Sequence, residues 1–333
     1  MTTVSQKRSL SIPDVSERAD CQARLRAMSA IASSQHTSQA PTVAGALPRP
    51  AGGVLLDYLS LLLPYEFSWL AIVFFGTASV LYANGQRVLA QSGEPVARWR
   101  SALFWLGLAL AYSVMHTRFD YYAQFMFFIH RIQHLALHHV AAILLMGANP
   151  WRALAAGFPE GGAKRWIARV LQSPLVQWPY RFIQFPPIAV MVFAGLIFFW
   201  LTPSIHFNAM LSQPLYLLMN WSMFIDGLLF WWLILDPRSP ARVGTLGFGK
   251  RILVIWAATV PQLALGAYIV GAPQSLYDIY EVCGRAWPIA PHDDQVLGGL
   301  FTWIPPAMMG VLVMVVVLRR LLHQSDNDGA QPA

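Results

Sequence analysis

Residues 120–147 read DYYAQFMFFIHRIQHLALHHVAAILLMG, and this segment decides the fold of the chain. After Asp120 it carries one full charge, Arg131, within a run of apolar, aromatic and imidazole side chains. About 20 predominantly apolar residues are enough for a helix to cross the roughly 30 Å hydrocarbon core of a bilayer. The segment therefore predicts a membrane-spanning helix whose few polar side chains face protein rather than lipid.

The composition of the whole chain agrees with a membrane-embedded fold. Of its 333 residues, 56% are hydrophobic and 12% are charged, whereas a soluble domain carries about 25% charged residues. So little charge leaves too little polar surface for a soluble globule of this size. We predict an all-α, polytopic bundle of about seven transmembrane helices, at approximately residues 66–84, 99–116, 120–147, 183–202, 212–235, 251–270 and 297–318.

The segments outside these helices predict three regions. Residues 1–52 are polar and poor in aromatic residues, which indicates a disordered tail, and Met28 is an alternative start. Residues 53–323 form the transmembrane domain, and residues 324–333 form a second disordered tail. Residues 53–64 and 164–181 mix apolar with charged side chains and predict one or two helices lying on the membrane surface.

The loop charges predict an orientation. Most lysines and arginines outside the N-terminal tail follow the first, third and fifth predicted helices or lie at the C-terminus. The positive-inside rule therefore places the C-terminus in the cytoplasm and the N-terminus outside. Loop bias also accounts for the net charge of +7, so no nucleic-acid partner is predicted.

Three histidines of the 120–147 segment share one helical face. His130, His134 and His138 are spaced four residues apart, so each lies about 6 Å above the last along a helix. Two imidazoles at this spacing can chelate a metal ion or flank a haem. They can equally hold neighbouring helices together by hydrogen bonds. His138 and Asp120 are in addition candidates for a proton relay.

The predicted topology gathers further polar residues in the outer half of the bundle. The resulting candidate metal ligands are His130, His134, His116, His206, His292 and Asp294. Methionines at similar depth (Met115, Met126 and Met210) favour copper, because thioether and imidazole ligands suit Cu(I) better than magnesium or calcium. Methionine also packs well in any apolar core, so none of the three is assigned as a ligand.

Two charges fall deep within predicted helices. Arg131 and Asp226 lie at comparable depth, and an ion pair between them would offset the cost of burying each charge alone. The sequence holds no Walker A, GxSxG or HExxH motif, so we predict neither a nucleotide ligand nor an enzyme.

Three motifs are spread along the membrane domain. They are HRIQH at 130–134, with an apolar run to GANP at 147–150; GLLFWW at 227–232, followed by Leu235-Asp236-Pro237; and DQVLGGL at 294–300, followed by Trp303-Ile304-Pro305. They resemble the HMxQH…LLxxGxP, GLLFWW and DQxLGGLxMWxP segments of the multi-span cytochrome c oxidase assembly factor family (CtaG). The resemblance covers about residues 120–305, which is nearly the whole predicted membrane domain.

The resemblance implies a seven-span protein of the bacterial cell (inner) membrane that assists maturation of a haem-copper oxidase. Oxidase subunits are then its partners, copper its cargo, and His130, His134, His206 and Asp294 its site residues. Arg131 departs from the family's usual methionine. Tyr216 and Asn220 stand where many members carry two histidines, which implies a lost or remodelled part of any metal site.

Three functions follow from these features. The first is a copper-carrying assembly factor, or metallochaperone, that serves respiratory-chain biogenesis. The second is an electron-transfer membrane subunit, with span-three histidines and His116 or His206 as axial haem ligands. The third is a copper or proton-coupled transporter that uses the three histidines as its path.

Overall fold

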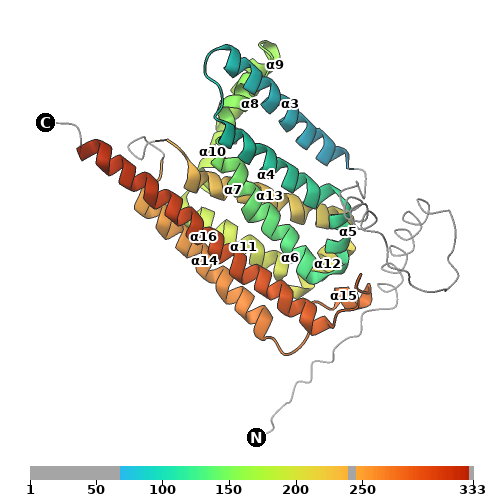
Figure 1. The fold of residues 1–333 in the computed structure, drawn as a ribbon. Coiled ribbons are helices and arrows are strands. Elements are labelled where there is room, and N and C mark those ends of the chain that lie inside the picture. The colour runs from blue at the N-terminus through green and yellow to red at the C-terminus, as the bar shows by residue number, and fades with distance from the viewer. Residues whose placement is uncertain (1–67, 239–244, 330–333) are drawn as a thin grey trace, which may run out of the picture.

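The structure is a computed structural model that describes residues 68–238 and 245–329 of the chain (Figure 1). Within these residues the fold is all-helical, with no strand, which confirms the predicted fold class. The predicted disordered tail 1–52 and the predicted surface helix 53–64 lie outside the described residues. Helix α16 ends at Gly329, five residues beyond the start of the predicted C-terminal tail at residue 324.

The helices follow one another with short connections. In chain order they are α3 (Trp69–Gln91), α4 (Arg98–His116), α5 (Arg118–Phe125), α6 (Phe127–Leu135), the π-helix η1 (Ala136–Ala141), α7 (Ala142–Gly147), α8 (Trp151–Gly157), α9 (Gly162–Gln172), α10 (Pro174–Ile183), α11 (Pro186–Leu201), α12 (Pro203–Leu211), α13 (Gln213–Leu235), α14 (Phe248–Gly271), α15 (Ile279–Val282) and α16 (Pro291–Gly329).

Three of the described helices are long and apolar enough to cross a membrane by length and composition. They are α13, α14 and residues 291–322 of α16. The pair α10 and α11, which bends by 76° at a short break, makes a fourth candidate if both helices belong to one span. A helical element lies at every predicted span, but the predicted number of seven is not established. Helix α11 has only 16 residues, and the 120–147 segment is divided among α5, α6, η1 and α7.

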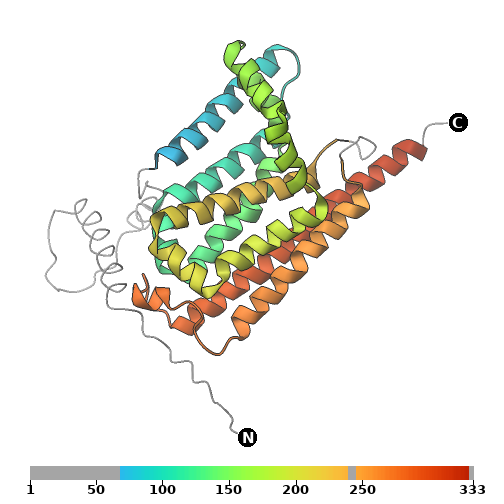
Figure 2. The ribbon, with the colours of Figure 1, turned by 180° about the vertical axis from the view of Figure 1, so that it is seen from behind.

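The bundle is organised around the segment α6–η1–α7. Figures 1 and 2 show α14 and α16 side by side along one edge, and α16 packs in turn against α6. Helix α13 packs against η1 and α7 from another direction, while α4 contacts the same two elements. The polar residues of 120–147 are consequently enclosed by protein, with His130, His134 and His138 each at most 1% exposed.

Two glycines allow the closest of these contacts. A Cβ at Gly227 of α13 would lie 2.6 Å from the carbonyl oxygen of His138 in η1. A Cβ at Gly298 of α16 would overlap the ring of Phe127 at the start of α6. Both glycines belong to the family-like motifs, and any larger residue would push α13 or α16 away from the central segment.

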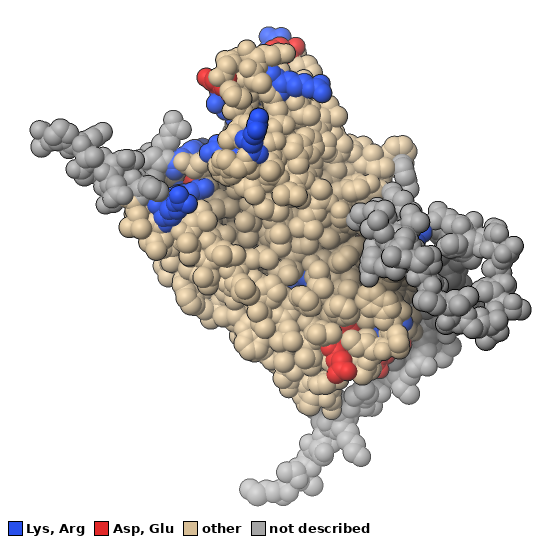
Figure 3. All heavy atoms as spheres, in the orientation of Figure 1, with Lys and Arg blue, Asp and Glu red and all other residues tan. Residues whose placement is uncertain are grey.

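The surface is divided by charge. Figure 3 shows basic side chains gathered toward the end that holds α9 and the C-terminal end of α16. Acidic side chains lie near α15 and also among the basic ones at the α9 end, and a wide belt with very little charge lies between the two ends on this face. An uncharged belt between polar ends is the surface that a bilayer requires.

Helices α9 and α10 correspond to the predicted surface segment 164–181. Neither contains a buried residue. The apolar residues of α9 recur at the spacing of one helical face, and Trp166 is 61% exposed beside the basic residues Lys164 and Arg165. An exposed apolar face bordered by basic side chains is typical of a helix that lies on a membrane surface.

Candidate functional site

The site is built on the N-terminal end of α6. The chain is extended at Met126 (φ −140°, ψ 121°), so α5 ends and α6 begins anew at Phe127. The carboxylate of Asp294 accepts hydrogen bonds from the backbone N–H groups of Phe127 (3.2 Å) and Phe128 (2.9 Å). Arg285 Nε donates to the same carboxylate at 3.0 Å. Asp294 therefore caps the helix that carries the histidines, because an anion satisfies the free N–H groups of a helix start.

Three imidazoles lie together, two of them one to two turns into α6 and the third on α12. The ring centroids of His130 and His134 are 4.3 Å apart, and His206 of α12 lies 5.1 Å from His130. We call these three residues the histidine cluster. Each is at most 1% exposed, so the cluster is shielded from solvent on all sides. The structure thus brings together three of the six candidate metal ligands.

Hydrogen bonds occupy two of the three rings. His134 Nδ1 accepts from Arg131 Nη1 (3.2 Å), so its Nε2–H donates to Asn220 Oδ1 (3.1 Å). His206 Nδ1–H donates to the carbonyl of Trp200 (3.1 Å), and Nε2 accepts from the Tyr280 hydroxyl (3.0 Å). Neither nitrogen of His130 has a hydrogen-bond partner. Within the cluster, His130 is the imidazole with unused donor and acceptor capacity.

The two residues that replace family histidines face this cluster. Asn220 bonds to His134, and the ring of Tyr216 lies 6.1 Å from that of His130. The Tyr216 hydroxyl donates to Asp120 Oδ1 at 2.7 Å, and Gln133 Nε2 donates to the same oxygen at 2.6 Å. Asp120 is therefore a hydrogen-bond acceptor that fixes Tyr216 and Gln133, on the side of the cluster toward α5.

Arg131 and Asp226 do not pair, contrary to the sequence prediction. Arg131 Nε donates to Thr302 Oγ1 of α16 at 2.8 Å, besides the bond of its Nη1 to His134. Asp226 Oδ2 lies 2.9 Å from His138 Nε2 instead. Counting residues from the helix ends predicted similar depths in the membrane for the two charges. Depth does not determine the direction in which each side chain points from its helix.

The π-helix η1 divides the predicted row of three histidines. A π-helix forms i→i+5 rather than i→i+4 hydrogen bonds, so residues after 135 turn away from the α-helical register. His138 stacks on Phe193 of α11 (4.0 Å between centroids) and bonds to Asp226 of α13. Its carbonyl oxygen accepts from Trp231 Nε1 at 2.9 Å. The GLLFWW motif therefore holds η1 through Gly227 and Trp231.

The remaining candidates lie apart from the cluster. His292 is exposed at the start of α16. His116 is buried at the end of α4, where its ring lies 5.2 Å from Tyr112 and its Nδ1 has no partner. Over the described residues, no group of three or more His, Cys, Asp or Glu side chains has the arrangement needed to hold a metal ion. The six predicted ligands do not form one donor set.

Sequence reasoning missed four side chains that complete these contacts. They are Gln133, Gln262, Tyr280 and Thr302, all buried or nearly so. Gln133 stands within the HRIQH motif, and Thr302 lies eight residues after Asp294 on the face of α16 that meets α6. The sequence pattern could therefore have indicated Gln133 and Thr302. The contacts of Tyr280 and Gln262 depend on how helices far apart in the chain pack.

The fold and site define a helical protein with membrane-length apolar helices that encloses a histidine cluster. A scan against protein families matches residues 80–324 to the cytochrome c oxidase caa3 assembly factor family (Caa3_CtaG). The match spans well over half of the chain, and the chain belongs to this family. No curated protein and no solved structure matched in the two further comparisons.

Proposed function

We propose that this chain is a multi-pass protein of the bacterial cell membrane that holds copper transiently at the histidine cluster and passes it to a subunit of a haem-copper oxidase. Family membership supports the role in oxidase assembly. The basic end of the surface supports an orientation with the C-terminus in the cytoplasm and the cluster in the outer half. Copper is the cargo, and the oxidase subunit is the acceptor.

The observation that carries this proposal is the environment of His130. Its ring is fully buried, lies between His134 and His206, and makes no hydrogen bond through either nitrogen. A buried polar group without a partner is costly and calls for an explanation. Imidazole is a good ligand for copper, and coordination would use the free nitrogen.

The hydrogen bonds of His134 and His206 favour transient rather than permanent binding of copper. For His134 or His206 to join His130 as ligands, each ring must give up a hydrogen bond. Each such bond contributes a net of about 0.5–1.5 kcal/mol, so its loss subtracts from the affinity for copper. A site that hands over its copper must also release it. Competition between copper and these hydrogen bonds lowers the affinity and so favours release.

Copper binding to the purified protein tests the proposal. We expect Cu(I), offered to the full chain in detergent, to bind with a defined stoichiometry that the double variant His130→Ala/His134→Ala loses. His292→Ala is the matched control, because His292 is exposed whereas the histidines of the cluster are buried. Equal Cu(I) binding by the wild-type chain and the double variant would refute the cluster as the copper site.

A deletion strain tests the role in assembly. We expect its membranes to contain oxidase subunits with reduced copper content, restored by the wild-type chain and not by the double variant. Loss of the subunits themselves, with normal copper in the remainder, would instead indicate a scaffold that stabilises the subunits.

The haem and transport alternatives gain no support from the geometry. The ring of His130 lies 5.1 Å from that of His206, its predicted haem-ligating partner, and 4.3 Å from that of His134, too close in either pair for a porphyrin ring to lie between them. A Soret band after haem supplementation, or ion flux in proteoliposomes, would be the result that favours one of these alternatives.

A further inference from the structure

A small polar cavity lies beside the histidine cluster, deeper in the bundle. It is lined by residues of α6, η1, α11, α13, α14 and α16 and has a volume of about 10 Å³. Five of its lining side chains are polar, namely Arg131, His134, His138, His139 and Gln262. A cavity of roughly 10–15 Å³ is the smallest that holds one water molecule, provided that polar groups surround it.

Several polar atoms around this cavity lack partners. Nδ1 of His138 and Nδ1 of His139 are buried and make no hydrogen bond. Gln262 Nε2 lies 3.5 Å from His139 Nε2, at the outer limit of a hydrogen bond. All three side chains are at most 3% exposed. A buried water usually makes about three hydrogen bonds to such groups.

The π-helix explains why two consecutive histidines reach one place. The rings of His138 and His139 lie 5.0 Å apart, and both contact Phe193 of α11. A π-turn contains more residues than an α-turn, so consecutive side chains diverge somewhat less around the helix axis. Such insertions are frequent at functional sites, so the break in helical register points to a requirement beyond packing.

We propose that this cavity is a water-binding site that joins the histidine cluster to the His138–Asp226 pair in one hydrogen-bonded relay. On the cluster side, the guanidinium of Arg131 lines the cavity and can donate to the water, and its Nη1 also donates to His134 of the cluster. Across the water it continues through His138, whose Nε2 is bonded to Asp226. The volume admits nothing larger than one water molecule.

Radiolytic labelling tests this site in the full chain. X-ray pulses split water into hydroxyl radicals, and an ordered internal water oxidises the side chains next to it. Met223 lines the cavity, whereas Met219, one turn earlier on α13, does not line it. Both methionines are at most 1% exposed, so they form a matched pair. We expect several-fold more sulfoxide at Met223 than at Met219, with the excess resistant to a radical scavenger in the bulk solution.

A variant tests whether the polar side chains that line the cavity hold the water. Gln262→Leu keeps a similar volume and removes a polar partner, so labelling of Met223 should fall to the level of Met219. Gln172→Leu, on the surface helix α9, is the control and should leave labelling unchanged. Equal labelling of the two methionines in the wild-type chain would overturn the proposal, and that comparison decides even if Gln262→Leu fails to fold. Unchanged labelling in a folded Gln262→Leu protein would also contradict it.

Discussion

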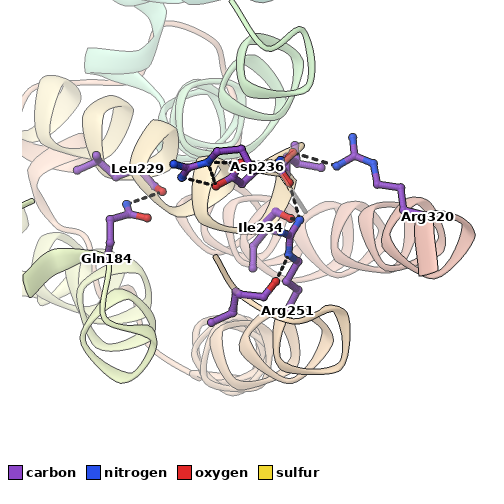
Figure 4. Close-up of polar contacts among 9 residues, drawn as sticks. Gln184, Leu229, Ile234, Asp236, Arg251 and Arg320 are labelled. Carbon is purple, nitrogen blue, oxygen red and sulfur yellow. Dashed lines mark hydrogen bonds and ion pairs between the residues drawn. The ribbon is translucent and has the colours of Figure 1, made fainter. Parts of the chain in front are cut away.

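The histidine cluster and the C-terminal end of α13 are two buried polar regions that satisfy their hydrogen bonds in opposite ways. At the end of α13, Arg251 donates to the carbonyls of Ile234 (2.9 Å), Asp236 (2.7 Å) and Leu246 (2.8 Å) (Figure 4). Arg320 of α16 donates to the carbonyl of Leu235 at 2.9 Å. We call Arg251 and Arg320 the arginine cap.

The arginine cap satisfies carbonyls that a helix end leaves free, and its positive charge opposes the negative end of the helix dipole. Figure 4 also shows Gln184 Nε2 donating to the carbonyl of Leu229 (2.9 Å), which ties the bend before α11 to α13. In the cluster, by contrast, neither nitrogen of His130 has a partner with good hydrogen-bond geometry, although the backbone of Ala123 lies near the ring. Nη2 of Arg251 is also buried without a partner, but the rest of that guanidinium makes three hydrogen bonds. We infer that the cap stabilises the fold, whereas His130 keeps bonding capacity at both ring nitrogens that a ligand can occupy.

The largest effect on stability is expected from Arg251→Leu. It removes three hydrogen bonds from a charged group and leaves buried carbonyls without donors, which costs about 3 kcal/mol or more. Thermal unfolding in detergent should show a melting temperature lower by roughly 6–12 °C. Lys250→Leu is the control, because Lys250 is the exposed neighbour. An unchanged melting temperature for Arg251→Leu would show that the cap is dispensable.

A smaller loss is expected from Asp294→Ala, which acts on both stability and the cluster. The start of α6 loses its cap and Arg285 loses its partner, at a cost of about 2 kcal/mol. Because α6 carries His130 and His134, Cu(I) binding should also weaken. The exposed neighbour Asp293 gives the control, Asp293→Ala. If both variants bind Cu(I) like the wild-type chain, Asp294 has no part in positioning the cluster.

The substitution Asn220→His sharpens the comparison by adding a ligand. The Asn220 side chain contacts the ring of His134, so an imidazole there would place a further nitrogen at the cluster. We expect Cu(I) affinity to rise about tenfold, equivalent to roughly 1.4 kcal/mol. A competition titration with a Cu(I) chelator measures it, with Asn208→His on the exposed side of α12 as the control. Unchanged or weaker affinity would count against copper at the cluster.

The smallest effect on stability is expected from His130→Leu. Replacing an unbonded imidazole by an apolar side chain of similar size should change the free energy of unfolding by no more than about 1 kcal/mol. The same variant should lose Cu(I) binding, so stability and function separate at this residue. His138→Leu is the contrasting variant. It leaves the Asp226 carboxylate buried without its partner, so the free energy of unfolding should fall by clearly more than in His130→Leu. A large loss of stability in His130→Leu would mean that His130 is structural.

Much of the helix layout was predictable, because hydropathy and proline position act locally. Predicted spans 99–116 and 212–235 agree closely with α4 and α13. The pairing of His130 with His134 followed from their spacing, and His206 was already a candidate. The predicted role of Asp294 as a ligand stays a prediction. Its capping of α6 was not foreseen, because the break at Met126 that exposes the N–H groups of α6 left no signal in the composition.

By itself, the sequence determined an apolar, all-helical chain, its family, and the placement of histidines within one segment, because these depend on residue type and short-range periodicity. The tertiary structure decided which of those histidines meet. The π-turn at η1 directs His138 toward Asp226, and the packing of α12 brings His206 to His130. Contacts between residues far apart in the chain depend on the direction and depth of every side chain across a packed interface, which no local pattern encodes.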